Sequence, residues 1–147
     1  TLENQLYQSN ISSSMIAYKD MPTNTSGNFF PAMIIDGTKL DNSCPLLTEE
    51  IFGPIAVCQP FSSIEDAIEK ANSTDYGLGA SVWTLNEINK RRCSLEIDCG
   101  TIGINTAVHS RFDTPFGGRK KSGIGLELGI EGILSFTKHK SILTTKN

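Results

Sequence analysis

Between residues 55 and 105, short apolar runs alternate with segments of helical spacing, and this alternation limits the possible fold more than any other feature. The apolar runs, which predict strands, cover residues 55–61, 78–84 and 101–105. Ser62 or Ser63 is expected to cap one intervening helix, and Asn86 to cap a second that runs to Asp98 before a stop at Gly100. Such alternation with short turns is typical of parallel βαβ units. The sequence therefore predicts an α/β fold built on a parallel sheet.

The rest of the chain shows weaker periodicity. The expected elements are loosely helical spacing over residues 1–18, a loop over 19–28, a strand over 29–35, irregular chain over 38–48 and a helix over 126–134. Within the first capped helix, the stripe predicted to be buried consists of Ile64, Ala67, Ile68 and Ala71. The tail from Ser135 to Thr145 is rich in β-formers and lysine, which favours an edge strand that another subunit can complete.

Composition narrows the kinds of partner. A net charge of −3 and a sequence pI near 5.3 provide no basic stripe for nucleic acid or an anionic membrane. No apolar run approaches the ~20 residues that span a bilayer. The cysteines, Cys44, Cys58, Cys93 and Cys99, lack Cys-x-x-Cys spacing and a nearby His, so we expect no metal site. Scattered reduced thiols favour a cytoplasmic protein.

A sharp corner, Glu49-Glu50-Ile51-Phe52-Gly53-Pro54, precedes the strand predicted over 55–61. Pro54 fixes its own φ and keeps Gly53 out of the helical region, so the chain must turn here. One interpretation is a site for a ligand with hydroxyls beside a flat ring, because a carboxylate accepts hydrogen bonds and an aromatic side chain packs on a π-face. The alternative is a solvated acid pair before a turn.

The loop after the strand predicted over 101–105 is the second candidate site, since ligands in open α/β sheets gather beyond the carboxyl ends of strands. His109 could act as a general base, although a lone His without a partner is more often a surface or wall residue. Arg111 could pair with a substrate carboxylate or be solvated. Phe112 and Phe116 could line a pocket or belong to the core.

Four motifs in the same order and spacing resemble the C-terminal third of the NAD(P)-dependent aldehyde dehydrogenase superfamily. They are the corner 49–54, the segment 71–80, Gly103-Ile104-Asn105 and the Gly-rich segment 115–129, within a resemblance that spans residues 29–143. The chain departs from the pattern in two places: Leu126 stands where the family often has Arg, and Ser12 to Ala17 lacks the Gly-rich turn usual before the first strand.

The resemblance implies specific roles. Glu50 would hold the nicotinamide ribose hydroxyls of NAD or NADP, and Phe52 would pack against that ribose and the nicotinamide. Gly103 and Asn105 would lead into a loop, residues 106–116, that lines the aldehyde entrance. The substrate-binding candidates in that loop are His109, Arg111, Phe112 and Phe116.

The resemblance also implies a division of the chain. Residues 1–134 would be the C-terminal portion of the catalytic domain, and residues 135–147 an oligomerisation strand. The full enzyme would oxidise an aldehyde, a semialdehyde among the options, to a carboxylic acid. Its Cys nucleophile, Glu general base and Asn oxyanion donor have no match in this chain, so we expect no catalytic residue here and no activity of the chain alone. The alternatives are a non-catalytic self-association module, or part of a superfamily acyl-phosphate reductase, which fits the corner and Pro115-Phe116-Gly117-Gly118 less well.

Overall fold

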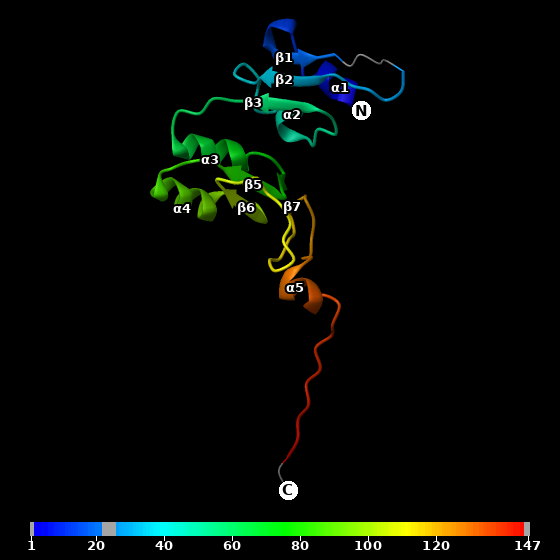
Figure 1. The fold of residues 1–147 in the computed structure, drawn as a ribbon, viewed down its shortest axis with the longest axis vertical. Helices are drawn as coiled ribbons and strands as arrows, with labels where there is room; N and C mark the ends of the chain where they lie inside the picture. The colour runs from blue at the N-terminus through cyan, green and yellow to red at the C-terminus, as the bar shows by residue number, and fades with distance from the viewer. Residues whose placement is uncertain (1, 22–25, 146–147) are drawn as a thin grey trace. The chain divides into compact units, whose positions relative to one another are not determined.

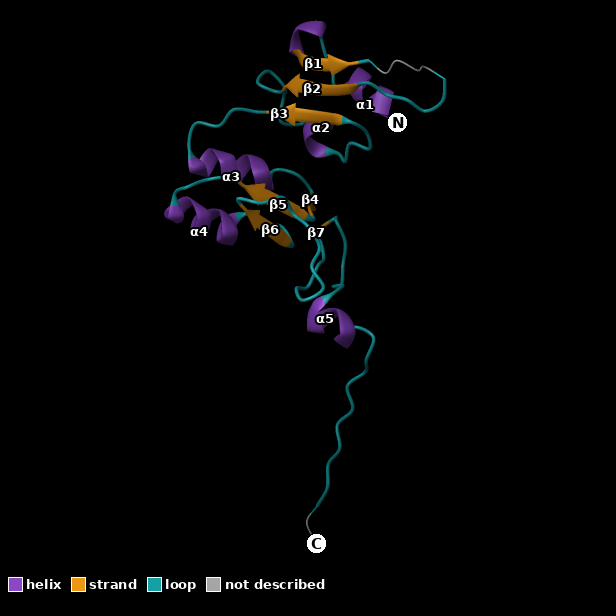
Figure 2. Cartoon of the chain, in the orientation of Figure 1, coloured by secondary structure: helices purple, strands orange, loops and turns teal. Residues whose placement is uncertain are grey.

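A computed structural model describes residues 2–21 and 26–145, which divide into two compact units, Thr1–Asp75 and Tyr76–Asn147 (Figure 1). The helices are α1 (Leu2–Gln8), α2 (Pro45–Thr48), α3 (Ile64–Asn72), α4 (Glu87–Glu96) and α5 (Gly129–Leu134), with a 3-10 turn at Ser13–Met15. The strands are β1 (Ile16–Asp20), β2 (Ala32–Asp36), β3 (Ile55–Cys58), β4 (Tyr76–Gly77), β5 (Gly79–Val82), β6 (Thr101–Ile104) and β7 (Arg119–Lys120) (Figure 2). The chain is therefore α/β, as predicted.

The first unit is built on a three-stranded sheet of order β1-β2-β3. β2 lies antiparallel to β1 and parallel to β3, with Met33 opposite Ile55. Alternate residues of β2 point into the unit, so that Met33 and Ile35 are buried while their neighbours are exposed. Ile35 is fully buried and packs with Cys44 and Leu46 in the core cluster. This core supports the segment that leads into the corner.

α3 is the last helix of the first unit along the chain, and it begins at the predicted cap. The Ser63 hydroxyl accepts a hydrogen bond from the Asp66 amide at 3.2 Å, which satisfies one of the unpaired donors of the first turn. Burial along the predicted stripe is deepest at Ile68 and partial at Ile64 and Ala67. The prediction for Ala71 is wrong, because its side chain is exposed one residue before the helix ends.

The second unit contains a parallel βαβ element, β5–α4–β6. Gly79 pairs with Thr101 at one end of the ladder and Val82 with Ile104 at the other. α4 starts at the predicted cap, where the Asn86 side chain accepts hydrogen bonds from two amides of the first turn. The helix ends at Glu96 with Ile97 as its C-cap, so the predicted end at Asp98 and stop at Gly100 are two to three residues too late. A two-residue antiparallel ladder joins β4 to β7.

The structure refines other expectations from the sequence. The strands predicted over 55–61, 78–84 and 101–105 each lie in a parallel ladder within one unit, β3 beside β2 in the first unit and β5 beside β6 in the second. β1 covers the end of the 1–18 segment and the first two residues of the loop predicted over 19–28, of which residues 22–25 lie outside the described residues. Its mostly exposed side chains explain why no apolar alternation marked it. α2 lies within the stretch expected to be irregular.

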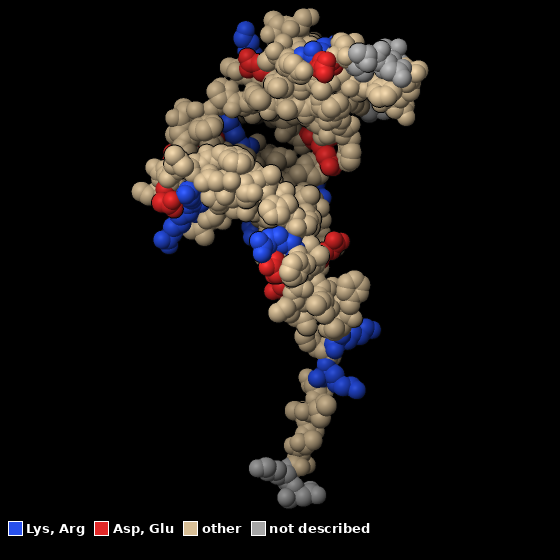
Figure 3. Space-filling model, in the orientation of Figure 1, with Lys and Arg blue, Asp and Glu red and all other residues tan. Residues whose placement is uncertain are grey.

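The C-terminal segments also differ from the prediction. The predicted helix over 126–134 begins only at Gly129, because the Glu127 amide and carbonyl pair with Phe116 in an antiparallel bridge at 2.8 and 2.7 Å. Residues 135–145 contain no strand in this single chain, and the edge strand that another subunit would complete stays a prediction. Figure 3 shows acidic and basic side chains in small groups of both signs over each unit. Every helix in residues 2–21 and 26–145 is too short or too polar to cross a bilayer.

Candidate functional site

The corner 49–54 is held by hydrogen bonds from two neighbouring elements of the first unit. The Gln5 side chain of α1 donates to the Glu49 carboxylate and to the Glu50 carbonyl, both at 3.1 Å. The Met33 amide at the start of β2 donates to the Pro54 carbonyl at 2.9 Å, and the Ile55 amide to the Gly53 carbonyl at 2.9 Å. The backbone of the corner is therefore fixed before any ligand arrives.

The two carboxylates of the corner have different surroundings. Glu49 is engaged by Gln5, whereas the Glu50 carboxylate is exposed and makes no hydrogen bond or ion pair with any described residue. Two residues further on, the Phe52 side chain is 82% exposed. The ring is therefore accessible to a ligand from outside the first unit. One acceptor and one ring on a fixed corner fit a ligand that carries hydroxyls beside a flat ring.

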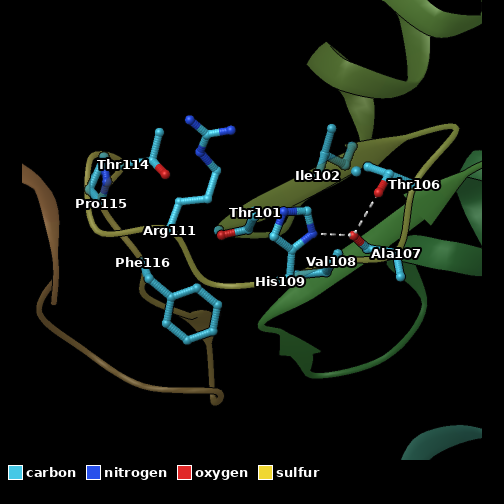
Figure 4. A pocket seen from close by; sticks show the side chains of 12 residues that line it. Thr101, Ile102, Thr106, Ala107, Val108, His109, Arg111, Thr114, Pro115 and Phe116 are labelled. Carbon is cyan, nitrogen blue, oxygen red and sulfur yellow. Dashed lines mark hydrogen bonds between the residues drawn. The ribbon is translucent and has the colours of Figure 1, made fainter.

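In the second unit, a cavity of about 470 Å³ lies along β6 and the loop that follows it (Figure 4). Its size falls in the usual range for small-molecule pockets. The wall is formed by Gly100, Thr101, Ile102, Gly103, Thr106, Ala107, Val108, His109, Arg111, Thr114, Pro115 and Phe116. Three of the four predicted loop residues, His109, Arg111 and Phe116, thus line one cavity. Phe112 does not line it and is 87% exposed.

Asn105 turns the chain from β6 into the loop. Its φ of 54° lies in the left-handed region, which Asn tolerates better than most residues. Its side-chain amide makes the two hydrogen bonds that the backbone of a neighbouring strand would make. It accepts from the Thr84 amide at 2.8 Å and donates to the Thr84 carbonyl at 3.0 Å. Gly103 permits the return of the loop, because a Cβ there would lie 2.6 Å from the Thr106 carbonyl oxygen.

His109 is oriented by the loop backbone. Its Nδ1 lies 3.0 Å from the Ala107 carbonyl oxygen, which also accepts from the Thr106 hydroxyl at 3.3 Å (Figure 4). A carbonyl oxygen can only accept, so Nδ1 carries the proton in this hydrogen bond. The neutral imidazole then has its lone pair at Nε2, which is the atom that could accept a proton or a hydrogen bond.

Arg111 is paired within the loop. Its Nε and Nη2 donate to the two Asp113 carboxylate oxygens at 2.9 and 2.8 Å. This bidentate pair lowers the pKa of Asp113 and raises the pKa of Arg111. The sequence prediction did not include Asp113. Among the described residues, His, Cys, Asp and Glu form no group of three that could hold a metal ion.

The model of the aldehyde dehydrogenase family matches residues 8–142, and the chain therefore belongs to that family. A probable succinate-semialdehyde dehydrogenase (NADP+) of Synechocystis is 39% identical over 116 residues, which cover 79% of this chain and 25% of the relative. Succinate-semialdehyde dehydrogenase (NADP+) 1 of Mycobacterium tuberculosis is 40% identical over the same length and shares. The chain thus spans about a quarter of the length of these curated relatives.

Solved structures agree with this assignment. An aldehyde dehydrogenase of Mycobacterium tuberculosis complexed with NAD+ matches with a TM-score of 0.87 and 35% identity over 98% of this chain and 30% of that chain. Succinic semialdehyde dehydrogenase from Streptococcus pyogenes in complex with NADP+ matches with a TM-score of 0.85 and 31% identity over 99% and 31% of the two chains. The predicted family and α/β class are both confirmed.

Proposed function

We propose that this chain is the C-terminal portion of the catalytic domain of an enzyme that oxidises an aldehyde to a carboxylic acid with NAD or NADP. The observation that supports the proposal most directly is the pairing of an unengaged Glu50 carboxylate with an 82% exposed Phe52 ring on a fixed corner. The matched relatives include proteins described with NADP+ and structures with bound NAD+ or NADP+. Those dinucleotides carry ribose hydroxyls beside a flat ring.

In this proposal the corner positions the cofactor. The Glu50 carboxylate accepts hydrogen bonds from the hydroxyls of the nicotinamide ribose, and the Phe52 ring packs against that ribose and the nicotinamide. The bound cofactor supplies the hydride acceptor. The role of the corner is therefore orientation, since a misplaced ring slows a reaction that depends on a close approach between donor and acceptor.

The cavity of the second unit binds the aldehyde in this proposal. Phe116, Val108 and Pro115 provide apolar walls, while His109 and Arg111 provide polar contacts. The names of the matched relatives make a semialdehyde one candidate substrate, with Arg111 as the partner of its carboxylate. Phe112 stays a predicted contact of the entrance, although it does not line the cavity itself.

The remaining parts of the proposal concern the whole enzyme. A thiol nucleophile, a general base and an oxyanion donor come from segments outside these residues, so the 147-residue chain alone does not turn over an aldehyde. Residues 135–147 form an oligomerisation strand that adds to another subunit. The enzyme is cytoplasmic and binds neither nucleic acid nor membrane, in keeping with the net charge of −3 that the 147 residues carry.

Glu50→Gln tests the proposal in the full-length enzyme, with Glu49→Gln as a matched control. The amide keeps the shape of Glu50 but removes the charge that strengthens hydrogen bonds to hydroxyls, so single-turnover hydride transfer should slow by about tenfold. Glu49→Gln should change that rate little, because its carboxylate is engaged by Gln5. Equal rates in the wild type and in Glu50→Gln would refute the assigned role.

A further inference from the structure

Few charged side chains line the cavity in the second unit. Of the residues that line it, Arg111 is the one with a permanent positive charge, whereas the lining threonines offer hydroxyl donors without a charge. A substrate that carries a carboxylate as well as its aldehyde needs such a cation. A carboxylate loses hydration when it enters the cavity, and this costs free energy unless a cation pairs with it. The availability of Arg111 therefore bears directly on which aldehydes the cavity can take.

Asp113 already occupies the Nε–Nη2 edge of the Arg111 guanidinium, which is the edge that can hold a carboxylate through two parallel hydrogen bonds. Its two oxygens accept from Nε and Nη2 at 2.9 and 2.8 Å, which is the bidentate geometry that a substrate carboxylate would seek. Asp113 itself does not line the cavity. Nη1 and Nη2 still point donors along the other edge, but the charge of the guanidinium is compensated before a substrate arrives.

Asp113 and a substrate carboxylate compete for the Arg111 guanidinium, and the competition favours Asp113 without excluding the substrate. Asp113 lies two residues from Arg111, and a short tether gives it an effective concentration in the millimolar range or above. The side chains of Arg111 and Asp113 remain 60% and 44% exposed, and an ion pair at such exposure is weak. A substrate carboxylate at sub-millimolar concentration can therefore displace Asp113 from Arg111, but it binds somewhat more weakly than it would to an unpaired guanidinium.

We propose that Asp113 is a specificity-determining residue that disfavours carboxylate-bearing aldehydes by occupying the Arg111 guanidinium. The inference rests on the proposed aldehyde oxidation and adds the substrate charge as the property under control. Asp113 acts through Arg111, so it is a positioning residue and touches no reacting atom.

Asp113→Asn in the full-length enzyme tests this inference with two substrates, succinate semialdehyde and the uncharged butanal. Removing the competing charge should lower KM for succinate semialdehyde about two- to fivefold, the range expected for an exposed ion pair. The ratio of kcat/KM for succinate semialdehyde over butanal should rise by the same factor. Asp113→Ser should shift the ratio in the same direction, and Asp113→Glu should restore a value near that of the wild type.

Two controls separate the inference from a general charge effect. Asp98→Asn removes one carboxylate from another exposed Arg–Asp pair of the second unit, with Arg119, and should leave the ratio unchanged. The double variant Arg111→Gln with Asp113→Asn should have the same ratio as Arg111→Gln alone. An unchanged ratio in both Asp113→Asn and Asp113→Ser overturns the inference while aldehyde oxidation stands. A wild-type enzyme that oxidises no aldehyde overturns the proposed function and the inference together.

Discussion

The side chain of Asn105 carries a prediction that can be worked through from its contacts. Replacing it by alanine removes two hydrogen bonds to the Thr84 backbone and leaves a side chain that is strained at a φ of 54°. The site is exposed, so each hydrogen bond contributes at the lower end of the usual range, about 0.5 kcal/mol. The left-handed backbone costs alanine about 1 kcal/mol. Together these effects destabilise the carboxyl end of the β5–β6 ladder by about 2 kcal/mol.

Hydrogen exchange measures this local loss without requiring global unfolding. The amide of residue 105 donates to the Val82 carbonyl through the backbone and keeps this hydrogen bond in both variants, so its exchange, corrected for the intrinsic rate of the new residue, reports opening of this end of the ladder. The Thr84 amide loses its acceptor in both variants and therefore exchanges independently of this opening. A loss of about 2 kcal/mol corresponds to roughly thirtyfold faster exchange. Asn105→Gly is the matched control, because it loses the same hydrogen bonds without the backbone strain and should accelerate exchange only about fivefold.

The comparison between these two variants separates the cost of the lost hydrogen bonds from the cost of the left-handed backbone. Equal acceleration in Asn105→Ala and Asn105→Gly would mean that the left-handed backbone carries no cost. Unchanged exchange in Asn105→Ala would refute the reasoning that the side-chain amide extends the ladder.

Lys70→Gln should raise the pKa of the Asp66 carboxyl toward its ordinary value of 3.8, because the Lys70 hydrogen bond is the largest cause that lowers it. Since the folded-state pKa is lowered, the stabilisation by Asp66 is complete above pH 3.8 and is lost as the pH falls through the lowered pKa. An NMR titration of the carboxyl in both proteins checks this, and equal values would contradict it. Deleting residues 135–147 should reduce self-association of the chain measured by light scattering at micromolar concentration, and an unchanged mass would contradict the proposed oligomerisation strand.

Local signals explain what the sequence predicted about the fold. Ser62 or Ser63, and Asn86, were predicted as caps because such side chains bond to amides two or three residues further on. The structure places the caps at Ser63 and Asn86. The sheet assignment depends on partners that are distant in sequence. β3 pairs with β2, twenty or so residues earlier, and nothing local in β3 distinguishes that partner from β5. β1 escaped prediction because an exposed edge strand needs no apolar alternation.

The candidate site was predictable to a similar extent. His109, Arg111 and Phe116 were expected near a pocket because their loop follows a strand, and all three line the cavity. Asp113 was missed because its pairing depends on a turn in which the Thr114 amide donates to the Arg111 carbonyl at 3.4 Å. That turn places the two charged side chains on the same side of the loop, and neither composition nor periodicity encodes it.

The loop 106–116 is anchored at its two ends. Asn105 ties one end to Thr84, and the bridge between Phe116 and Glu127 ties the other. Most side chains between these anchors are exposed, and Val108, which lies half-buried beside Gly79 of β5, is the exception that a replacement loop has to keep. A loop of equal length taken from another aldehyde dehydrogenase should therefore be accepted between Asn105 and Phe116 with little loss of stability. The architecture separates the part of the chain that must be conserved for folding from the part that selection can vary to obtain a new substrate.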